Sequence, residues 1–163
     1  MPWAAALREA AGGRVVVLGI GNDLRADDGA GSLVARSLRE RFPDAAFDGG
    51  QAPENASGPV RRVRPDTVIV VDAADFGGAP GEVRVATATG AAAGLTLGTH
   101  ALPIGTFMQA LGEMTGAAVH LMAIQAVTTA FGAAMTPEVA VAVVEVTREL
   151  AEILQTSKQG RDQ

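Results

Sequence analysis

Residues 19–31 read GIGNDLRADDGAG, and this stretch decides the fold of the chain. It follows residues 14–18 (RVVVL), whose length and β-branched content predict a strand that stops at a glycine. Apolar residues separated by charges then predict an amphipathic helix: Leu33, Val34 and Leu38. The first strand therefore ends in a turn with three aspartates, at the edge where open α/β sheets carry their sites.

Glycines after a first strand also suggest a dinucleotide-binding turn, but two features argue against one. Gly19 and Gly21 match the first two positions of that fingerprint, whereas the third falls on Leu24, whose side chain would block close helix–strand packing. A pyrophosphate also needs backbone N–H groups with no anions beside them, and this turn contains Asp23, Asp27 and Asp28. Clustered carboxylates instead favour a cation. An alternative role, capping of the following helix, suits one of the two adjacent aspartates.

Length and composition favour a single domain. A chain of 163 residues can bury a substantial core, and no uncharged apolar run is long enough to cross a bilayer, so we expect no membrane insertion. We expect one domain at residues 14–155, between an N-terminal extension at 1–13, poorly ordered or a short helix, and a frayed polar tail at 156–163. The early charges at the N-terminus do not fit a signal peptide.

Cysteine content and charge narrow the function classes. The absence of cysteine excludes disulfides, thiolate metal sites and a cysteine nucleophile, and it fits a cytoplasmic location. A net charge of −5 argues against nucleic acid as a partner. We expect the one basic cluster to be a solvated helix end: Arg61, Arg62 and Arg64.

Hydrophobic runs and chain breakers alternate as strands and helices do in α/β proteins. Residues 67–73 (TVIVVDA) are continuously apolar up to Asp72 and predict a strand buried on both faces. Residues 82–86 alternate polar and apolar after a connection too short for a helix, so they predict an antiparallel edge strand. We expect further strands at 45–48 and 118–124, a helical segment broken at 58–59, and helices at 29–41, 103–115 and 136–154, the last capped by Thr136. This order predicts a three-layer α/β/α sandwich on a mixed, mostly parallel five-stranded sheet.

Three residues that are far apart in the chain form the candidate site. Asp28 follows the first strand, Asp72 ends the central strand, and His100 precedes a helix. Because parallel strands end at one crevice, we expect two carboxylates and an imidazole to meet there and to hold zinc, nickel or another divalent ion. Two alternative roles stay open, an Asx turn at Asp72 and a loop backbone hydrogen bond at His100.

Other catalytic arrangements have little support in this sequence. It contains no HExxH pair, no GxSxG elbow and no phosphate-binding loop with its lysine. Ser32 lies in the first turn of a helix with no histidine near it in sequence, so a serine mechanism is weakly supported. His120 lies inside a predicted strand, away from the strand end, and is left out of the site.

Five motifs, in this order and spacing, resemble those of the hydrogenase maturation endopeptidases: GIGNDLRADDGAG, DGGQAPEN, VIVVDAADFG, PGEVRV and THALP. The resemblance covers residues 14–152, and the element Pro53-Glu54-Asn55 looks most like the branch that serves formate-hydrogenlyase-type hydrogenases. It implies a phosphorylase/hydrolase-like fold. It also implies removal of a C-terminal extension from the large-subunit precursor of a [NiFe]-hydrogenase after nickel insertion. In that reaction the substrate supplies the nickel, and none need be bound to the isolated protein.

The resemblance also assigns residues. The family's metal-contacting positions fall on Asp28, Asp72 and His100, the same three that the strand order selected. A turn that the family uses in substrate choice falls on Asp48, Gly49, Gly50 and Gln51. One motif departs from the family, because residues 123–126 read AIQA where the family often has GIQP.

A mechanism follows as a hypothesis. The three residues bridge the precursor's nickel, and a water polarised by the metal or activated by a carboxylate attacks the scissile carbonyl. Two other functions stay open on the same residues: a nickel-sensing chaperone that binds the large subunit without cutting it, and a metal-dependent hydrolase of another peptide or amide.

Overall fold

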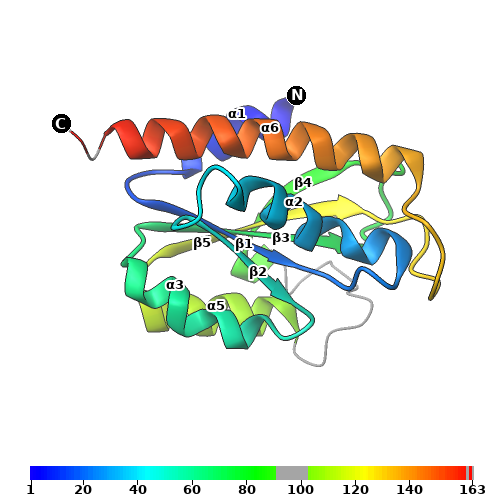
Figure 1. The fold of residues 1–163 in the computed structure, drawn as a ribbon, viewed down its shortest axis with the longest axis horizontal. Coiled ribbons are helices and arrows are strands. Elements are labelled where there is room, and N and C mark those ends of the chain that lie inside the picture. The colour runs from blue at the N-terminus through cyan, green and yellow to red at the C-terminus, as the bar shows by residue number, and fades with distance from the viewer. Residues whose placement is uncertain (91–102, 161, 163) are drawn as a thin grey trace.

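The computed structural model describes residues 1–90, 103–160 and 162, and it contains one five-stranded sheet in the order β2-β1-β3-β5-β4 (Figure 1). The strands are β1 (Val15–Ile20), β2 (Ala46–Gly50), β3 (Thr67–Ala74), β4 (Val83–Thr87) and β5 (Ala118–Gln125). The first three and β5 run parallel, and β4 pairs antiparallel with β5 at the edge. The predicted fold class and the antiparallel edge strand are confirmed.

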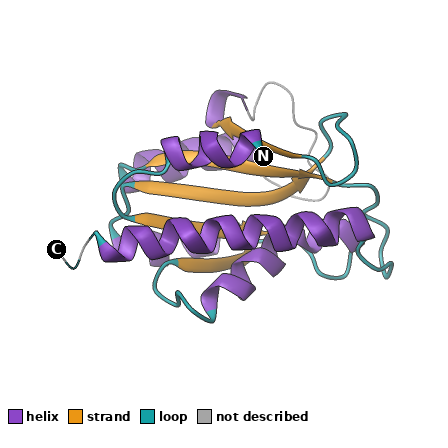
Figure 2. Ribbon diagram, turned by 90° about the horizontal axis from the view of Figure 1, so that it is seen from above, coloured by secondary structure: helices purple, strands orange, loops and turns teal. Residues whose placement is uncertain are grey.

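Helices cover both faces of this sheet (Figure 1). One face carries α1 (Pro2–Ala10), α2 (Ala30–Arg39) and α6 (Pro137–Gln159), and the other carries α3 (Ser57–Val63) and α5 (Ile104–Thr115). Figure 2, turned to look from above, shows α1 and α6 running along the strands. In the described part of the chain no helix is both long and apolar enough to cross a membrane.

The strands explain why two cores form. Along β1 the side chains alternate, so that Val15 and Val17 pack under α2 and α6 while Val16 and Leu18 pack against the α3–α5 layer. Full burial of one such side chain contributes about 1.5–3 kcal/mol. The continuous apolar runs in β1 and β3 are therefore what parallel strands covered on both faces require.

Two glycines let α2 lie unusually close to the strands. A Cβ added at Gly19 would lie 2.1 Å from the carbonyl oxygen of Gly31, and one added at Gly31 would lie 2.1 Å from that of Val71 and 2.2 Å from that of Ile20. All three obstacles are backbone atoms, which cannot move aside as a flexible side chain can. Gly19 and Gly31 thus allow α2 to pack closely on the strands, although Leu24 stands where a dinucleotide-binding turn would have its third glycine.

Gly31→Ala is expected to lower the free energy of unfolding by about 3 kcal/mol, since the new methyl group pushes α2 off β1 and β3. Chemical denaturation measures the change. The matched control is Gly12→Ala, because nothing lies within 4 Å of a Cβ at Gly12. That variant should stay within about 0.5 kcal/mol of the parent. Equal stability of the two variants would contradict the close-packing argument.

Several predicted boundaries differ from the structure. The segment predicted to break at 58–59 is instead continuous through α3, because Pro59 lies in the first turn, where its missing N–H has no helical partner. The break falls between η2 (Pro53–Ala56) and α3. The final helix continues to Gln159, past the predicted end at 154, and Ser157 in its last turns accepts a hydrogen bond from the Val15 N–H.

The N-terminal extension forms the short helix α1, one of the two alternatives predicted for it. Leu7 of α1 is fully buried in the core shared with α2 and α6.

Candidate active site

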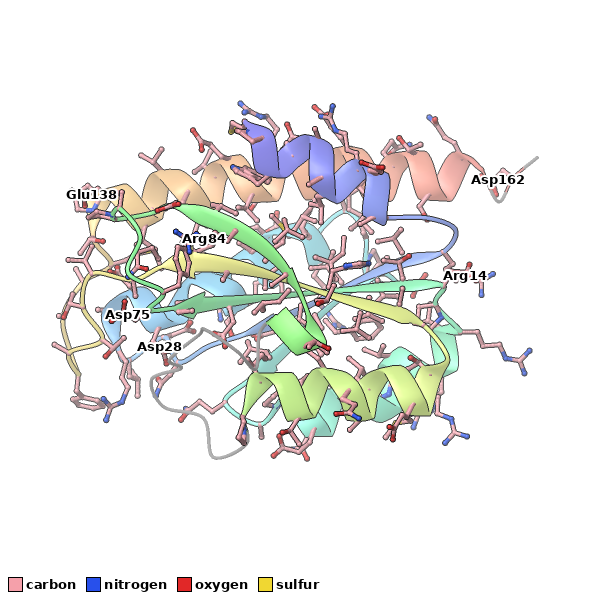
Figure 3. The ribbon with its side chains drawn as sticks, turned by 180° about the vertical axis from the view of Figure 1, so that it is seen from behind. Arg14, Asp28, Asp75, Arg84, Glu138 and Asp162 are labelled. Atoms are coloured by element: carbon pink, nitrogen blue, oxygen red, sulfur yellow. The ribbon has the colours of Figure 1, made fainter. Side chains whose placement is uncertain are left out.

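The candidate site lies where β1, β3 and β5 end. Asp28 belongs to η1 (Ala26–Gly29), the turn between β1 and α2, and is 2% exposed. It lines a cavity of about 240 Å³ together with residues at the end of β3 or just after β3 and β5: Ala73, Ala74, Asp75, Ala126, Val127, Thr128 and Thr129. Figure 3 shows Asp28 and Asp75 at the same end of the sheet. The turns that follow β1 and β3 thus bring acidic residues to one edge of the sheet.

The backbone of the turn holds Asp28 in place. Its N–H donates to the Arg25 carbonyl at 3.0 Å, and its carbonyl accepts from the Asn22 N–H at 3.1 Å. Only glycine fits at position 21, where a Cβ would lie 2.4 Å from the Asp28 carbonyl oxygen. Ser32 is buried and its hydroxyl donates to the Gly21 carbonyl, so it supports the turn and is not exposed to a substrate.

Asp72 lies inside β3 and is fully buried. The strand continues two residues past it to Ala74, so the prediction that Asp72 ends the strand is wrong in that detail; hydrogen-bonded pairing with β5 extends the strand. Alternation puts Asp72 on the same face as Val70 and Ala74, which pack in the α3–α5 layer. Its neighbours Ala73 and Ala74 line the cavity that contains Asp28.

His100 lies outside the described residues. Within residues 1–90 and 103–160, no three metal-binding side chains come together closely enough to hold an ion. The predicted metal-contacting set therefore stays a prediction. His120, which the sequence argument left out, lies half-buried in β5, opposite Ile69 in the register.

The turn assigned to substrate choice ends β2 at the same edge. The Gly50 N–H donates to the Asp48 carboxylate at 3.0 Å, and the Gly50 carbonyl accepts from the Gly21 N–H at 3.0 Å. A cavity of about 470 Å³ is lined by this turn and by η2 and α3, including Asp48, Gly49 and Gln51. The turn is thus attached directly to the turn that carries Asp28.

Arg36 of α2 joins these two turns by charge. Its guanidinium lies 2.8 Å from the Asp23 carboxylate and 3.4 Å from that of Asp48. The hydrogen bond with Asp23 is the main cause of a raised pKa for Arg36, and Asp48 adds to it while burial opposes it. The guanidinium of Arg36 therefore stays charged between the turn that carries Asp23 and the turn that carries Asp48.

Asp27 was not assigned by sequence reasoning. Its fully buried carboxylate accepts hydrogen bonds from the N–H groups of Val127 at 2.8 Å, Thr128 at 3.2 Å and Thr136 at 2.7 Å. The Thr136 hydroxyl donates to the same carboxylate at 3.0 Å. Neither aspartate caps α2, whose N-cap is Gly29, and Thr136 does not cap α6 with its side chain. The capping role suggested for one of the aspartates is therefore wrong. Thr136 is the N-cap residue of α6, as predicted, but its hydroxyl binds Asp27 instead of the helix backbone.

Gln125 was also missed, although it lies in the motif that departs from the family. Its side-chain oxygen accepts from the N–H groups of Phe76 and Gly78, and its amide donates to Asp75 and to the Ala126 carbonyl. All hydrogen-bonding groups of this buried amide are satisfied. Where the family often has proline, the Ala126 N–H donates to the Ala74 carbonyl at 3.0 Å, a bond that proline could not make.

Asp75 stands exposed beside the cavity as a charged group. A hydrogen bond from the Gly77 N–H, and then one from the Gln125 amide, lower the pKa of this carboxyl below its ordinary value. Because both bonds favour the ionised form, Asp75 carries its negative charge at neutral pH and adds to the acidic character of this edge.

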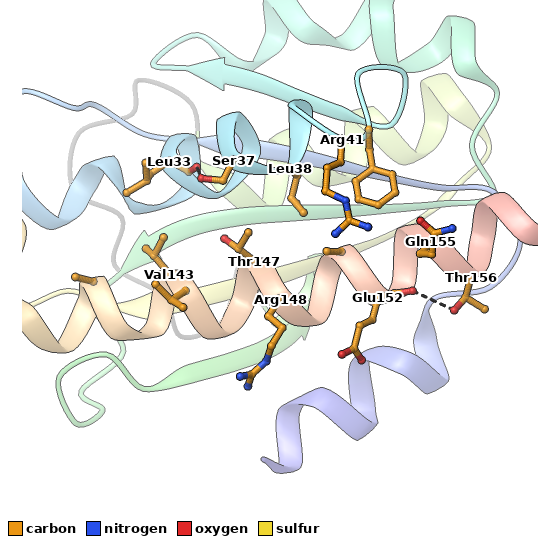
Figure 4. Close-up of a pocket in the computed structure, with 14 residues that line it drawn as sticks. Leu33, Ser37, Leu38, Arg41, Val143, Thr147, Arg148, Glu152, Gln155 and Thr156 are labelled. Carbon is orange, nitrogen blue, oxygen red and sulfur yellow. Dashed lines mark hydrogen bonds between the residues drawn. The ribbon is translucent and has the colours of Figure 1, made fainter.

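Two larger cavities lie elsewhere. One of about 970 Å³ runs between α2 and α6 and is lined by residues such as Leu33, Val143 and Thr147 (Figure 4). Another, of about 880 Å³, lies beside Arg14 and the end of α6, near the start of β1. Neither contains Asp28 or Asp72. Since open α/β sheets carry their sites at the carboxyl ends of the strands, position outweighs volume here.

Comparisons with known proteins point to one family. The model of a family described as hydrogenase maturation protease matches residues 33–153. The curated Hydrogenase 3 maturation protease of Escherichia coli K12 is 35% identical over 108 residues, which cover 65% of this chain and 69% of that protein.

Solved structures agree with these matches. A crystal structure titled as the [NiFe] hydrogenase maturation protease HycI from Thermococcus kodakarensis superimposes with a TM-score of 0.81 at 33% identity, covering 92% of this chain and 99% of that one. The solution structure of the endopeptidase HycI from Escherichia coli superimposes with a TM-score of 0.74 at 34% identity. The match covers 85% of this chain and 90% of that one.

Proposed function

Since the chain belongs to the hydrogenase maturation protease family, we propose that it removes the C-terminal extension of a [NiFe]-hydrogenase large-subunit precursor after nickel has been inserted. Membership of the family makes it a peptidase, and the resemblance on which the sequence argument relied is confirmed. The observation that supports cleavage after nickel insertion is the acidic edge of the sheet. There Asp28 lines a cavity beside the end of β3, which carries Asp72.

The donor set suits the substrate's metal. Two carboxylates and an imidazole offer the oxygen and nitrogen ligands that Ni²⁺ accepts. In this proposal Asp28, Asp72 and His100 contact the nickel of the loaded precursor, which brings the scissile peptide to the cavity. A precursor without nickel offers the two carboxylates no cation and binds too weakly to be cut.

Hydrolysis then needs one water and a base. The water oxygen forms a bond to the scissile carbonyl carbon, and a site carboxylate takes the proton that the water releases. The carbon–nitrogen bond breaks as that proton passes to the leaving amine. The products are the mature large subunit and a short C-terminal peptide.

Substrate choice is assigned to the turn at the end of β2. Asp48, Gly49 and Gln51 border their own cavity, and Gly50 connects this turn to the turn of Asp28. The acidic side chain of Asp48 is exposed at the rim of this cavity, where it accepts from the Gly50 N–H and lies 3.4 Å from the guanidinium of Arg36. A precursor bound here would extend from the β2 turn to the cavity at the ends of β3 and β5.

The proposal is tested by giving the protein two forms of the precursor, one loaded with nickel and one free of it. Mass spectrometry of the products is expected to show loss of a C-terminal peptide from the loaded form alone. Binding of the loaded form without cleavage would instead support a nickel-sensing chaperone. Cleavage of both forms at equal rates would contradict nickel recognition.

A further inference from the structure

The loop between β5 and α6 packs apolar side chains against the core near its two ends, at Ala126 and Met135. Val127 is 53% exposed and Phe131 is 72% exposed, so neither side chain anchors the loop in the core. The loop backbone is attached to the turn between β1 and α2, because the Gly132 N–H donates to the Leu24 carbonyl at 2.8 Å. Between Ala126 and Met135 the loop is therefore held mainly by polar bonds.

The carboxylate of Asp27 supplies these bonds at both ends of the loop. One oxygen accepts from Val127 and Thr128 where the loop begins, and the other accepts from Thr136 where α6 begins. The Asp27 N–H donates back to the Thr128 carbonyl at 3.2 Å. Hydrogen bonds to an ionised acceptor are stronger than neutral ones, and burial of the group strengthens them further.

The same loop is a wall of the candidate site. Val127, Thr128 and Thr129 line the cavity together with Asp28, which directly follows Asp27 in the chain. One short turn thus carries two aspartates with different tasks: Asp28 borders the cavity, and Asp27 binds the loop that also lines it.

We propose that Asp27 is a positioning residue, and that the loop it holds binds the polypeptide of the precursor through the exposed side chains of Val127 and Phe131. This inference rests on the proposed function and names the surface that receives the substrate chain. Asp27 itself touches no substrate; it acts through residues 127–136.

Asp27→Asn tests the positioning role, because an amide keeps the size of the side chain but turns an NH₂ group toward backbone N–H donors. Hydrogen exchange at the amides of Val127, Thr128 and Thr136 is expected to quicken by about tenfold, and the KM for nickel-loaded precursor to rise by about tenfold, with kcat changed less. Circular dichroism checks that the variant is folded. Faster exchange with an unchanged KM would overturn the proposal, since a purely structural role predicts that result.

Phe131→Ser tests the contact itself without touching the bonds of Asp27. The KM for nickel-loaded precursor is expected to rise by about tenfold, because an aromatic contact is lost. Hydrogen exchange at the amides of Val127 and Thr128 should stay at the parent rate. Val144→Ser is the matched control, because Val144 is 67% exposed on α6 and belongs to a different cavity. An unchanged KM in Phe131→Ser would overturn the proposal.

These results are separable from a failure of the proposed function. If the parent protein neither binds nor cuts the loaded precursor, the proposed function fails. The exchange measurement needs no substrate and still reports whether Asp27 holds the loop.

Discussion

Asp28→Asn is expected to lower kcat/KM for nickel-loaded precursor by about a thousandfold. The substitution keeps the size of the side chain and removes the negative charge that faces the cavity. It therefore removes a contact to the substrate's cation and a candidate base for the attacking water. The rate is measured by mass spectrometry of the released peptide over time, with the folded state checked by circular dichroism.

The matched control lies in the same loop. Asp23→Asn removes a carboxylate that is exposed and paired with Arg36, on the solvent side of the turn. The kcat/KM of this variant should stay within about twofold of the parent value, because an exposed ion pair contributes little to stability. If Asp28→Asn processed the loaded precursor at the parent rate, the assignment of Asp28 would fall.

Asp72→Asn is expected to have an effect of similar size, about a hundredfold to a thousandfold in kcat/KM. Asp72 is fully buried in β3, and its asparagine variant keeps the volume that the core requires. If Asp28 and Asp72 contact one nickel, the double variant should lose little more than either single variant, because residues that act as a unit are not additive. Full additivity of the two losses would argue that they act separately.

A buried carboxylate far from the edge provides the control for Asp72. Glu149 of α6 is buried and forms an ion pair with Arg8 of α1. Glu149→Gln removes a buried charge just as Asp72→Asn does, so it should cost stability without changing kcat/KM of the folded protein. A loss of activity equal to that of Asp72→Asn would mean that burial of charge, rather than catalysis, explains both results.

The fold could be predicted because its signals are local. Continuous apolar runs at β1 and β3 require helices on both faces, and the alternating pattern at β4 suits an edge. The boundaries were less predictable, since the ends of β3 and α6 depend on pairing partners elsewhere in the chain. The family could be recognised because five motifs kept their order and spacing.

The candidate site was only partly predictable for the same reason. Strand order was enough to bring Asp28 and the end of β3 to one edge, whereas His100 lies outside the described residues and its role stays a prediction. Gln125 was missed because its partners follow a different strand, β3.

By itself, the sequence determined the α/β class, the position of the acidic edge and the family to which the chain belongs. The tertiary structure alone decided what Asp27 does. The sequence selected Asp28 for the site, but it gave no task to Asp27, which has the same side chain at the neighbouring position. Asp27 turns toward N–H groups about a hundred residues away, while Asp28 lines the cavity. A carboxylate is assigned its task by the partners around it, and only folding brings those partners into reach.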